Sequence, residues 1–101
     1  MEVRVTGRNV DLADHMEDYI LKKLNKLERL YPKIVDCRVV VSQEKFRWVV
    51  EANLEVKHSS LHARAEGEDF REAVDGLKEK MVRQLKSFKG KIISLHHREG
   101  R

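Results

Sequence analysis

Residues 34–57 read IVDCRVVVSQEKFRWVVEANLEVK, and this stretch decides the fold because apolar and polar residues alternate along it. Such alternation indicates half-buried β-strands. The predicted core side of the first strand, residues 34–44, is Val35, Cys37, Val39 and Val41. The predicted core side of the second strand, residues 46–57, is Phe46, Trp48, Val50, Ala52, Leu54 and Val56. The short link at 43–45 predicts that the two strands form a hairpin.

Two further strands and two helices are predicted around this hairpin. Alternation predicts a short strand over residues 2–6 and a fourth strand over 61–66, which Gly67 closes. Apolar residues at helical spacing predict a helix that is capped by Asp11 and ended by Pro32. A second helix is predicted to start at Asp69 and to stop at Gly90.

The resulting order predicts an α+β fold, β-α-β-β-β-α, in one domain. The first helix makes a right-handed crossover between two parallel strands, and the other strands pair antiparallel, so the four-stranded sheet is mixed. Only one face of the sheet is clearly apolar, so both helices are predicted to lie parallel on that face. We assign the domain to residues 1–91 and a short basic tail to residues 92–101, and the sequence leaves open whether this tail continues the second helix.

Positive charge is concentrated in two segments of the chain. Residues 22–33 carry a balance of +4 and residues 78–101 a balance of +6, whereas residues 1–21 and 34–77 carry −3 each. Parallel helices on one face bring their C-terminal ends together, so we expect the two segments to form one surface. A one-sided cationic surface indicates a polyanionic partner such as RNA.

Particular basic residues are candidates for phosphate contacts. Lys22, Lys26 and Arg29 recur at a spacing that lines one face of a helix. On the second helix, Arg83 and Lys86 are predicted to lie on the outer face, with Lys78 and Lys89 on its flank. Lysines near the end of a helix also complement its dipole, at about 0.3–1 kcal/mol each. Both interpretations fit one helix, and the two helices together favour RNA binding.

The sequence argues against catalysis and against a metal site. Cys37 is the only cysteine, which excludes an intrachain disulfide, and its place on the core side indicates a small buried residue. The histidines offer no complete metal-ligand set, and there is no glycine-rich phosphate loop. No apolar run is long enough to span a membrane. We therefore expect no cofactor, no small-molecule substrate and a cytoplasmic location.

The few aromatic residues are assigned mainly to the core. Phe46, Trp48, Phe70 and Phe88 lie on predicted core faces. Tyr19 lies at the edge of the apolar side of the first helix, where packing and contact with a base are equally compatible with the pattern. The sequence offers no exposed aromatic row that would stack single-stranded bases, so contact with folded RNA through its backbone fits better.

Several segments together resemble the ribosome hibernation-promoting factors, also known as ribosome-associated inhibitor A or protein Y. The segments are VTGRNV (5–10), YILKKL (19–24), KLER (26–29), VVVS (39–42), LHARAE (61–66) and DFREAVD (69–75). The resemblance continues through Lys80 to Lys89 and implies a fold similar to double-stranded RNA-binding domains. Longer family members add a C-terminal dimerisation domain, so this chain resembles a short form.

The resemblance also implies a partner and a set of site residues. Family members occupy the mRNA channel of the small ribosomal subunit near the decoding positions, where they block translation. By matching positions, the rRNA contacts would be Lys22, Lys23, Lys26, Arg29, Arg83, Lys86 and Lys89. Arg8 is a further candidate, although capping or packing would explain it equally well. We expect the free protein to be a monomer.

Two alternatives remain open from the sequence. One is a general binder of double-stranded or structured RNA that is not specific to ribosomes. The other is a protein–protein module that pairs through the edge of its short fourth strand.

Overall fold

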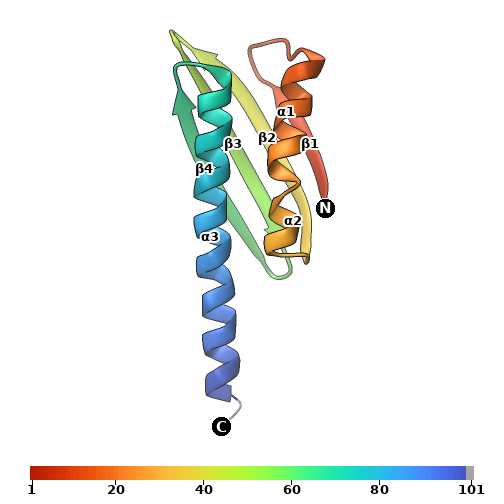
Figure 1. Cartoon of the computed structure of the whole chain (residues 1–101), viewed down its shortest axis with the longest axis vertical. Coiled ribbons are helices and arrows are strands. Elements are labelled where there is room, and N and C mark those ends of the chain that lie inside the picture. Colours follow the sequence, from red (N-terminus) through yellow and green to blue (C-terminus); the bar gives the residue numbers. More distant parts are fainter. Residues whose placement is uncertain (100–101) are drawn as a thin grey trace.

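The computed structural model describes the backbone of residues 1–99 and the side-chain surroundings of residues 1–90. Its elements in chain order are β1 (Glu2–Gly7), α1 (Asp14–Leu24), α2 (Leu27–Leu30), β2 (Ile34–Glu44), β3 (Arg47–Val56), β4 (Ser59–Gly67) and α3 (Phe70–Glu99). The strands form one sheet in the order β1-β2-β3-β4, in which β1 is parallel to β2 and the other pairs are antiparallel. The predicted mixed sheet is confirmed (Figure 1).

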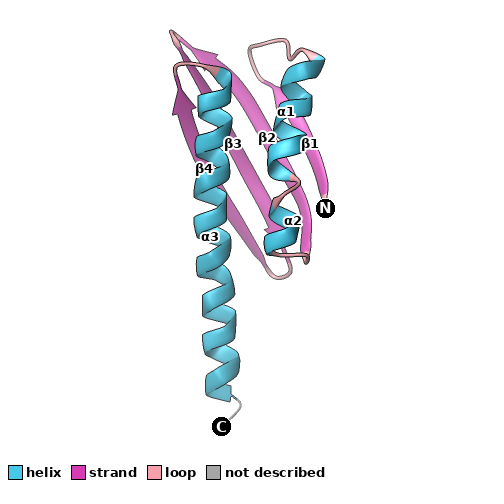
Figure 2. Cartoon of the chain, viewed as in Figure 1, coloured by secondary structure: helices cyan, strands magenta, loops and turns pink. Residues whose placement is uncertain are grey.

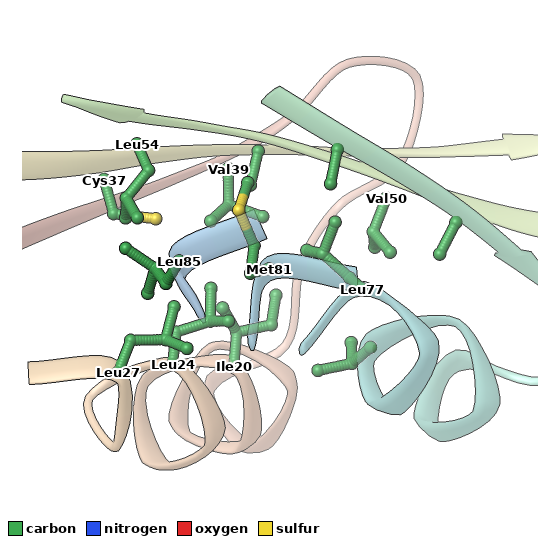
Figure 3. Close-up of a cluster of buried hydrophobic side chains, with 14 of the residues drawn as sticks. Ile20, Leu24, Leu27, Cys37, Val39, Val50, Leu54, Leu77, Met81 and Leu85 are labelled. Carbon is green, nitrogen blue, oxygen red and sulfur yellow. The ribbon is translucent and has the colours of Figure 1, made fainter. Parts of the chain in front are cut away.

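All the helices lie on one face of the sheet, and α1 and α3 run in the same direction (Figure 2). The core fills the space between these two layers. It contains Ile20, Leu24 and Leu27 from α1 and α2, Cys37, Val39, Val50 and Leu54 from the sheet, and Leu77, Met81 and Leu85 from α3 (Figure 3). Burying each large apolar side chain stabilises the fold by about 1.5–3 kcal/mol, so this layer fixes how the helices sit on the sheet.

Two residues that were predicted to be in the core are exposed. Val35 is 62% exposed because the β2–β3 register shifts between Ile34 and Asp36, and this irregularity turns Ile34 inward instead. Phe46 is 91% exposed because β3 begins one residue later, at Arg47. Phe46 occupies the two-residue turn of the hairpin after Lys45, whose φ is 54°. The positive φ turns the chain away from the core at this point.

The first helix is shorter and less regular than predicted. It divides into α1 and α2 at Asn25 and Lys26, where the amide of Arg29 donates to the Lys26 carbonyl at 3.2 Å. Bonds between residues three apart are those of a tighter 3₁₀ turn. Asp11 is not the N-cap; that position is Ala13, without a side-chain hydrogen bond. The segment before α1 folds inward so that Leu12 packs on the core, which delays the start of the helix.

The last helix begins as predicted and ends later than predicted. The Asp69 carboxylate accepts a hydrogen bond from the Glu72 amide at 2.8 Å, as an N-cap does. Gly90 does not end α3, which runs without a break to Glu99, across the boundary proposed at residue 91. A glycine inside a helix costs up to about 1 kcal/mol relative to alanine, which is not enough to end it here. Residues 100 and 101 of the proposed tail lie outside the described residues.

Candidate nucleic-acid interface

The two cationic segments lie side by side on the helical face of the molecule. The N-terminal segment covers the end of α1 and all of α2, and both elements contact α3 (Figure 1). The helix ends do not coincide as predicted, because α3 continues well past the end of α2. The segments nevertheless meet along the middle of α3, from Lys78 beside Lys26 to Lys89 at the Leu30 carbonyl. We call six residues of this region the cationic surface, and none of them has an ion pair within residues 1–90: Lys22, Lys26, Arg29, Lys78, Arg83 and Lys86.

Lys26 shows how closely the positive charges are brought together. Its side chain is exposed, yet the neighbouring charge of Lys78 on α3, followed by that of Lys23, lowers its pKa. Like charges disfavour the protonated amine, so a lowered pKa at an exposed lysine records local repulsion. Lys26 and Lys78 are 52 positions apart in the sequence, so packing of α1 and α2 against α3 creates this repulsion. A bound phosphate would relieve it.

A groove separates α1 from α3 beside Lys78. It is lined by Lys23, Asp75, Lys78, Glu79, Val82 and Arg83. The two carboxylates were not anticipated from the sequence as parts of the site. Asp75 is compensated by Lys23, whose ammonium lies 3.5 Å from its Oδ1 atom. The groove therefore keeps cations on both of its walls.

Tyr19 and Asp75 brace the two walls of this groove. The Tyr19 hydroxyl donates to Asp75 Oδ1 at 2.6 Å, and this hydrogen bond, followed by burial, raises the pKa of Tyr19. The Tyr19 ring packs against Phe70, and the charged ends of Lys23 and Arg71 each lie 5.4 Å from its centre. Of the two interpretations of Tyr19, the structure supports packing.

Two predicted contact residues are engaged inside the chain. Lys23 pairs with Asp75, as described above, and its side chain is only 28% exposed. Lys89 is partly buried and donates a hydrogen bond to the Leu30 carbonyl at 2.8 Å, at the end of α2. Both residues add positive potential to the region, but their ammonium groups also hold the helices together. Their distant partners leave no local signal in the sequence.

The fold does not place Arg8 near the other predicted RNA-contact residues. It follows β1, and its amide donates to the Val41 carbonyl at 2.9 Å. The loop that carries it lies at the end of the molecule where α1 and α3 begin (Figure 1). Acidic residues gather in those first turns, including Asp14, Glu17 and Glu72. Arg8 is therefore separate from the cationic surface.

The uncovered face of the sheet has a different electrostatic character. Arg64 lies 3.1 Å from Glu66 and 3.6 Å from Glu51, and Arg47 lies 3.2 Å from Glu66. Arg47 and Arg64 are thus each paired with a carboxylate, unlike the residues of the cationic surface. The side of the molecule that would attract a polyanion is therefore the helical side.

The groups that might support catalysis are placed unfavourably for it. Cys37 is fully buried, and burial raises the pKa of its thiol to about 11, so the reactive thiolate is suppressed. His62 Nδ1 lies 2.7 Å from the Asn53 side-chain oxygen on the open face of the sheet. Among the described residues, no cluster of histidine, cysteine and acidic side chains has the arrangement of a metal site.

None of the helices in the described part of the chain combines the length and the apolar content that a membrane span needs.

The sequence and the fold both match known proteins. The sequence profile of the family described as Sigma 54 modulation protein / S30EA ribosomal protein matches residues 3–93. A ribosome hibernation promoting factor of Klebsiella oxytoca is 38% identical over 92 residues, which cover 91% of this chain and 97% of that protein. One of Pseudomonas putida is 38% identical over 95 residues, which cover 94% of this chain and 93% of that protein.

Two solved structures show the same fold. A ribosomal subunit interface protein from Coxiella burnetii superposes with a TM-score of 0.85 at 28% identity, covering 89% of this chain and 99% of that one. The N-terminal domain of Thermus thermophilus Protein Y superposes with a TM-score of 0.79 at 27% identity, covering 87% of this chain and 99% of that one. By its sequence profile and its relatives, this chain belongs to the Sigma 54 modulation protein / S30EA ribosomal protein family, together with the ribosome hibernation promoting factors.

Proposed function

We propose that this protein binds the small ribosomal subunit through its cationic surface and holds the ribosome translationally inactive. The site on the subunit is the mRNA channel near the decoding positions, and the rRNA backbone is the contacted group. The role is one of binding without catalysis, in the cytoplasm. Family membership supports the ribosomal partner, and the geometry of the helical face supports the surface that meets it.

The observation that carries the proposal is the repulsion between Lys26 and Lys78 across two helices. Folding brings these ammonium groups together although it gains nothing from their mutual repulsion. A row of RNA phosphates supplies the missing negative charge, and each neutralised phosphate also releases condensed counterions. This repulsion supports a polyanion as the partner of the cationic surface.

The arrangement also explains how binding would stop translation. Long flexible lysine and arginine side chains contact phosphates without reading bases, so the protein recognises the shape of folded rRNA. A domain lodged in the mRNA channel excludes mRNA and tRNA by occupying their space. The acidic starts of α1 and α3 lie at the other end of the molecule and would face away from the rRNA.

The test is co-sedimentation with purified small subunits in a sucrose gradient. The triple variant Lys22→Glu/Lys26→Glu/Lys86→Glu reverses charge on the cationic surface, and we expect it to remain at the top of the gradient. A matched control, Arg38→Glu/Lys45→Glu/Lys57→Glu, reverses three charges at exposed positions of β2 and the strand turns. Both variants change the net charge equally, so a loss confined to the first identifies the surface.

Equal binding by the wild type and the first variant would overturn the proposed surface. Equal loss in both variants would show that only net charge matters. A general binder of structured RNA makes a different prediction, because an unrelated RNA hairpin would then compete as well as the subunit itself. We expect the subunit to be preferred when the two are present at equal phosphate concentration.

The number of phosphates contacted is accessible from salt dependence. If all six residues of the cationic surface meet phosphates, the plot of log affinity against log salt should have a slope of roughly −4 to −5. Replacing Lys26 with methionine should reduce the steepness by about 0.7–0.9, because one phosphate contact is lost. An unchanged slope would place Lys26 outside the interface.

A further inference from the structure

The outer edge of β4 is held by side chains of α3. β4 pairs with β3 along one side only, because it is the last strand of the sheet. The Lys80 ammonium donates a hydrogen bond to the Arg64 carbonyl at 2.6 Å, and the Gln84 side-chain amide donates to the His62 carbonyl. An edge strand normally leaves such groups free to pair with another strand.

The geometry of the two elements makes this contact systematic. Lys80 and Gln84 are four residues apart, which corresponds to a rise of about 6 Å along a helix. His62 and Arg64 are two residues apart, which corresponds to about 6.8 Å along an antiparallel strand. Carbonyls two residues apart in a strand point the same way, and here they point away from β3. Two successive turns of α3 thus each meet one outward carbonyl of β4.

We propose that the outer edge of β4 is a latent pairing surface for a second copy of this chain, held closed by Lys80 and Gln84. The paired form would be a two-fold dimer in which two β4 strands run antiparallel and join the sheets. In the free monomer, the α3 side chains occupy the carbonyls that the second strand would need. This inference does not depend on the proposed ribosomal role.

The charge pattern of β4 favours a second copy as the occupant. Arg64 and Glu66 lie on the same face of the strand, two residues apart. In an antiparallel two-fold pairing, Arg64 of each copy can stand opposite Glu66 of the other, which places two opposite-charge pairs across the join. Opposite charges directly across neighbouring strands are favourable. In this register Ala65 lies at the two-fold axis, and residues 63–67 of the two strands stand opposite each other.

The test replaces both donors with an apolar side chain of similar length. Lys80→Met/Gln84→Met removes the two hydrogen bonds while methionine keeps a high helix propensity at both positions. Analytical ultracentrifugation over a concentration series should show a monomer for the wild type and a monomer–dimer equilibrium for the variant. Circular dichroism checks that the fold is retained, and no RNA is present in the assay.

A matched control separates edge opening from a general change in composition. Lys57→Met/Gln43→Met makes the same two replacements at exposed positions of the β3–β4 turn and β2, outside the outer edge of β4, and we expect it to stay monomeric. Adding Glu66→Lys to the first variant should return it toward the monomer, because the introduced ammonium would face Arg64 of the second copy. A control that dimerises as strongly as the variant would overturn the proposal.

Amide hydrogen exchange supplies a second readout at the strand itself. The outward amides of Arg64 and Glu66, which lie inside the paired stretch, should exchange quickly in the wild type and become protected in the dimer. If the double variant precipitates, Lys80→Met alone opens the Arg64 carbonyl and gives the same readout at the Arg64 amide. A variant that stays monomeric at the highest concentration, with unprotected amides, would overturn the inference, and so would a dimeric wild type.

Discussion

The Lys89 ammonium and the Leu30 carbonyl, 59 positions apart in the sequence, form a hydrogen bond of 2.8 Å that joins the end of α2 to α3. The last carbonyls of a helix lack partners inside it and carry the negative end of its dipole. A lysine from a neighbouring helix supplies both a hydrogen-bond donor for such a carbonyl and a positive charge near the negative end of the dipole. Lys89 therefore contributes to stability, whereas Lys86, one turn earlier on α3, is exposed and belongs to the cationic surface.

Replacing these two lysines in turn should separate stability from binding. Lys89→Met should lower the free energy of unfolding by about 1.5–3 kcal/mol, the usual contribution of a hydrogen bond to a charged group. Lys86→Met should change it by less than about 0.5 kcal/mol, as exposed substitutions do. Urea denaturation measures both values. In subunit binding the order should reverse, with the larger loss for Lys86→Met, and equal losses in both assays would contradict this division.

Asn9 should be more important for stability than its exposure suggests. Its side-chain amide donates to the Gln43 carbonyl and its oxygen accepts from the Gln43 amide, both at 2.9 Å. The side chain thus extends the pairing of β1 with β2 by one step and holds the loop before α1. Asn9→Ala should cost about 1–3 kcal/mol in denaturant unfolding, at roughly 0.5–1.5 kcal/mol for each hydrogen bond.

Aspartate at this position is the matched control for Asn9. Asn9→Asp keeps the acceptor for the Gln43 amide and loses the donor, so its unfolding free energy should fall between those of Asn9→Ala and the wild type. Exchange of the Gln43 amide should quicken in Asn9→Ala and stay slow in Asn9→Asp. Wild-type stability in Asn9→Ala would show that the loop is held by other contacts.

The order of elements and the mixed sheet could be predicted because their signals are local and repeated. Alternation marks a strand and helical spacing marks a helix, whatever the rest of the chain does. The two misassigned residues lie where a single irregular residue shifts the alternation of inward and outward side chains. An irregular register at Ile34 exposes Val35, and a two-residue turn at Lys45 exposes Phe46. The apolar alternation in the sequence continues through these two points, whereas the backbone changes direction there and the side chains change faces.

The sequence could predict that two groups of basic residues form the cationic surface, but not which of those residues are engaged by partners inside the chain. Charge blocks are visible in the sequence, and the parallel helices implied that the blocks would meet. Lys23 pairs with Asp75, and Lys89 donates a hydrogen bond to the Leu30 carbonyl. Both partners are distant in sequence from the lysines that they engage. Periodicity cannot reveal pairs of that kind. The guarding of β4 by Lys80 and Gln84 was missed for the same reason.

Phe46 and Leu85 should respond very differently to truncation. Phe46 is 91% exposed and Leu85 is fully buried in the core (Figure 3). Phe46→Ala should change the free energy of unfolding by less than about 0.5 kcal/mol. Leu85→Ala should cost about 2–5 kcal/mol, because it removes transfer free energy and leaves a cavity. Thermal or urea unfolding measures both, and a large loss for Phe46→Ala would mean that its ring packs against the protein.

Cys37 should make the protein less stable at alkaline pH. Burial, followed by the charge of Asp36, raises the pKa of its thiol from 9.0 to about 11 in the folded state. Below pH 9 the thiol is protonated in both states, so its contribution to stability is fully present. As the pH rises toward 11, the unfolded chain loses this proton first and the folded state loses stability. The total effect is about 2–3 kcal/mol, at about 1.4 kcal/mol for each pKa unit.

Cys37→Ala isolates this contribution. The variant should be less stable than the wild type at pH 8, because a buried sulfur atom is lost and a small cavity remains. The difference between the two should shrink as urea denaturation is repeated from pH 8 to pH 11, since alanine does not titrate. Lysines and tyrosines titrate in both proteins, so their effects cancel in the comparison. A difference that stays constant with pH would show that the Cys37 thiol titrates alike in both states.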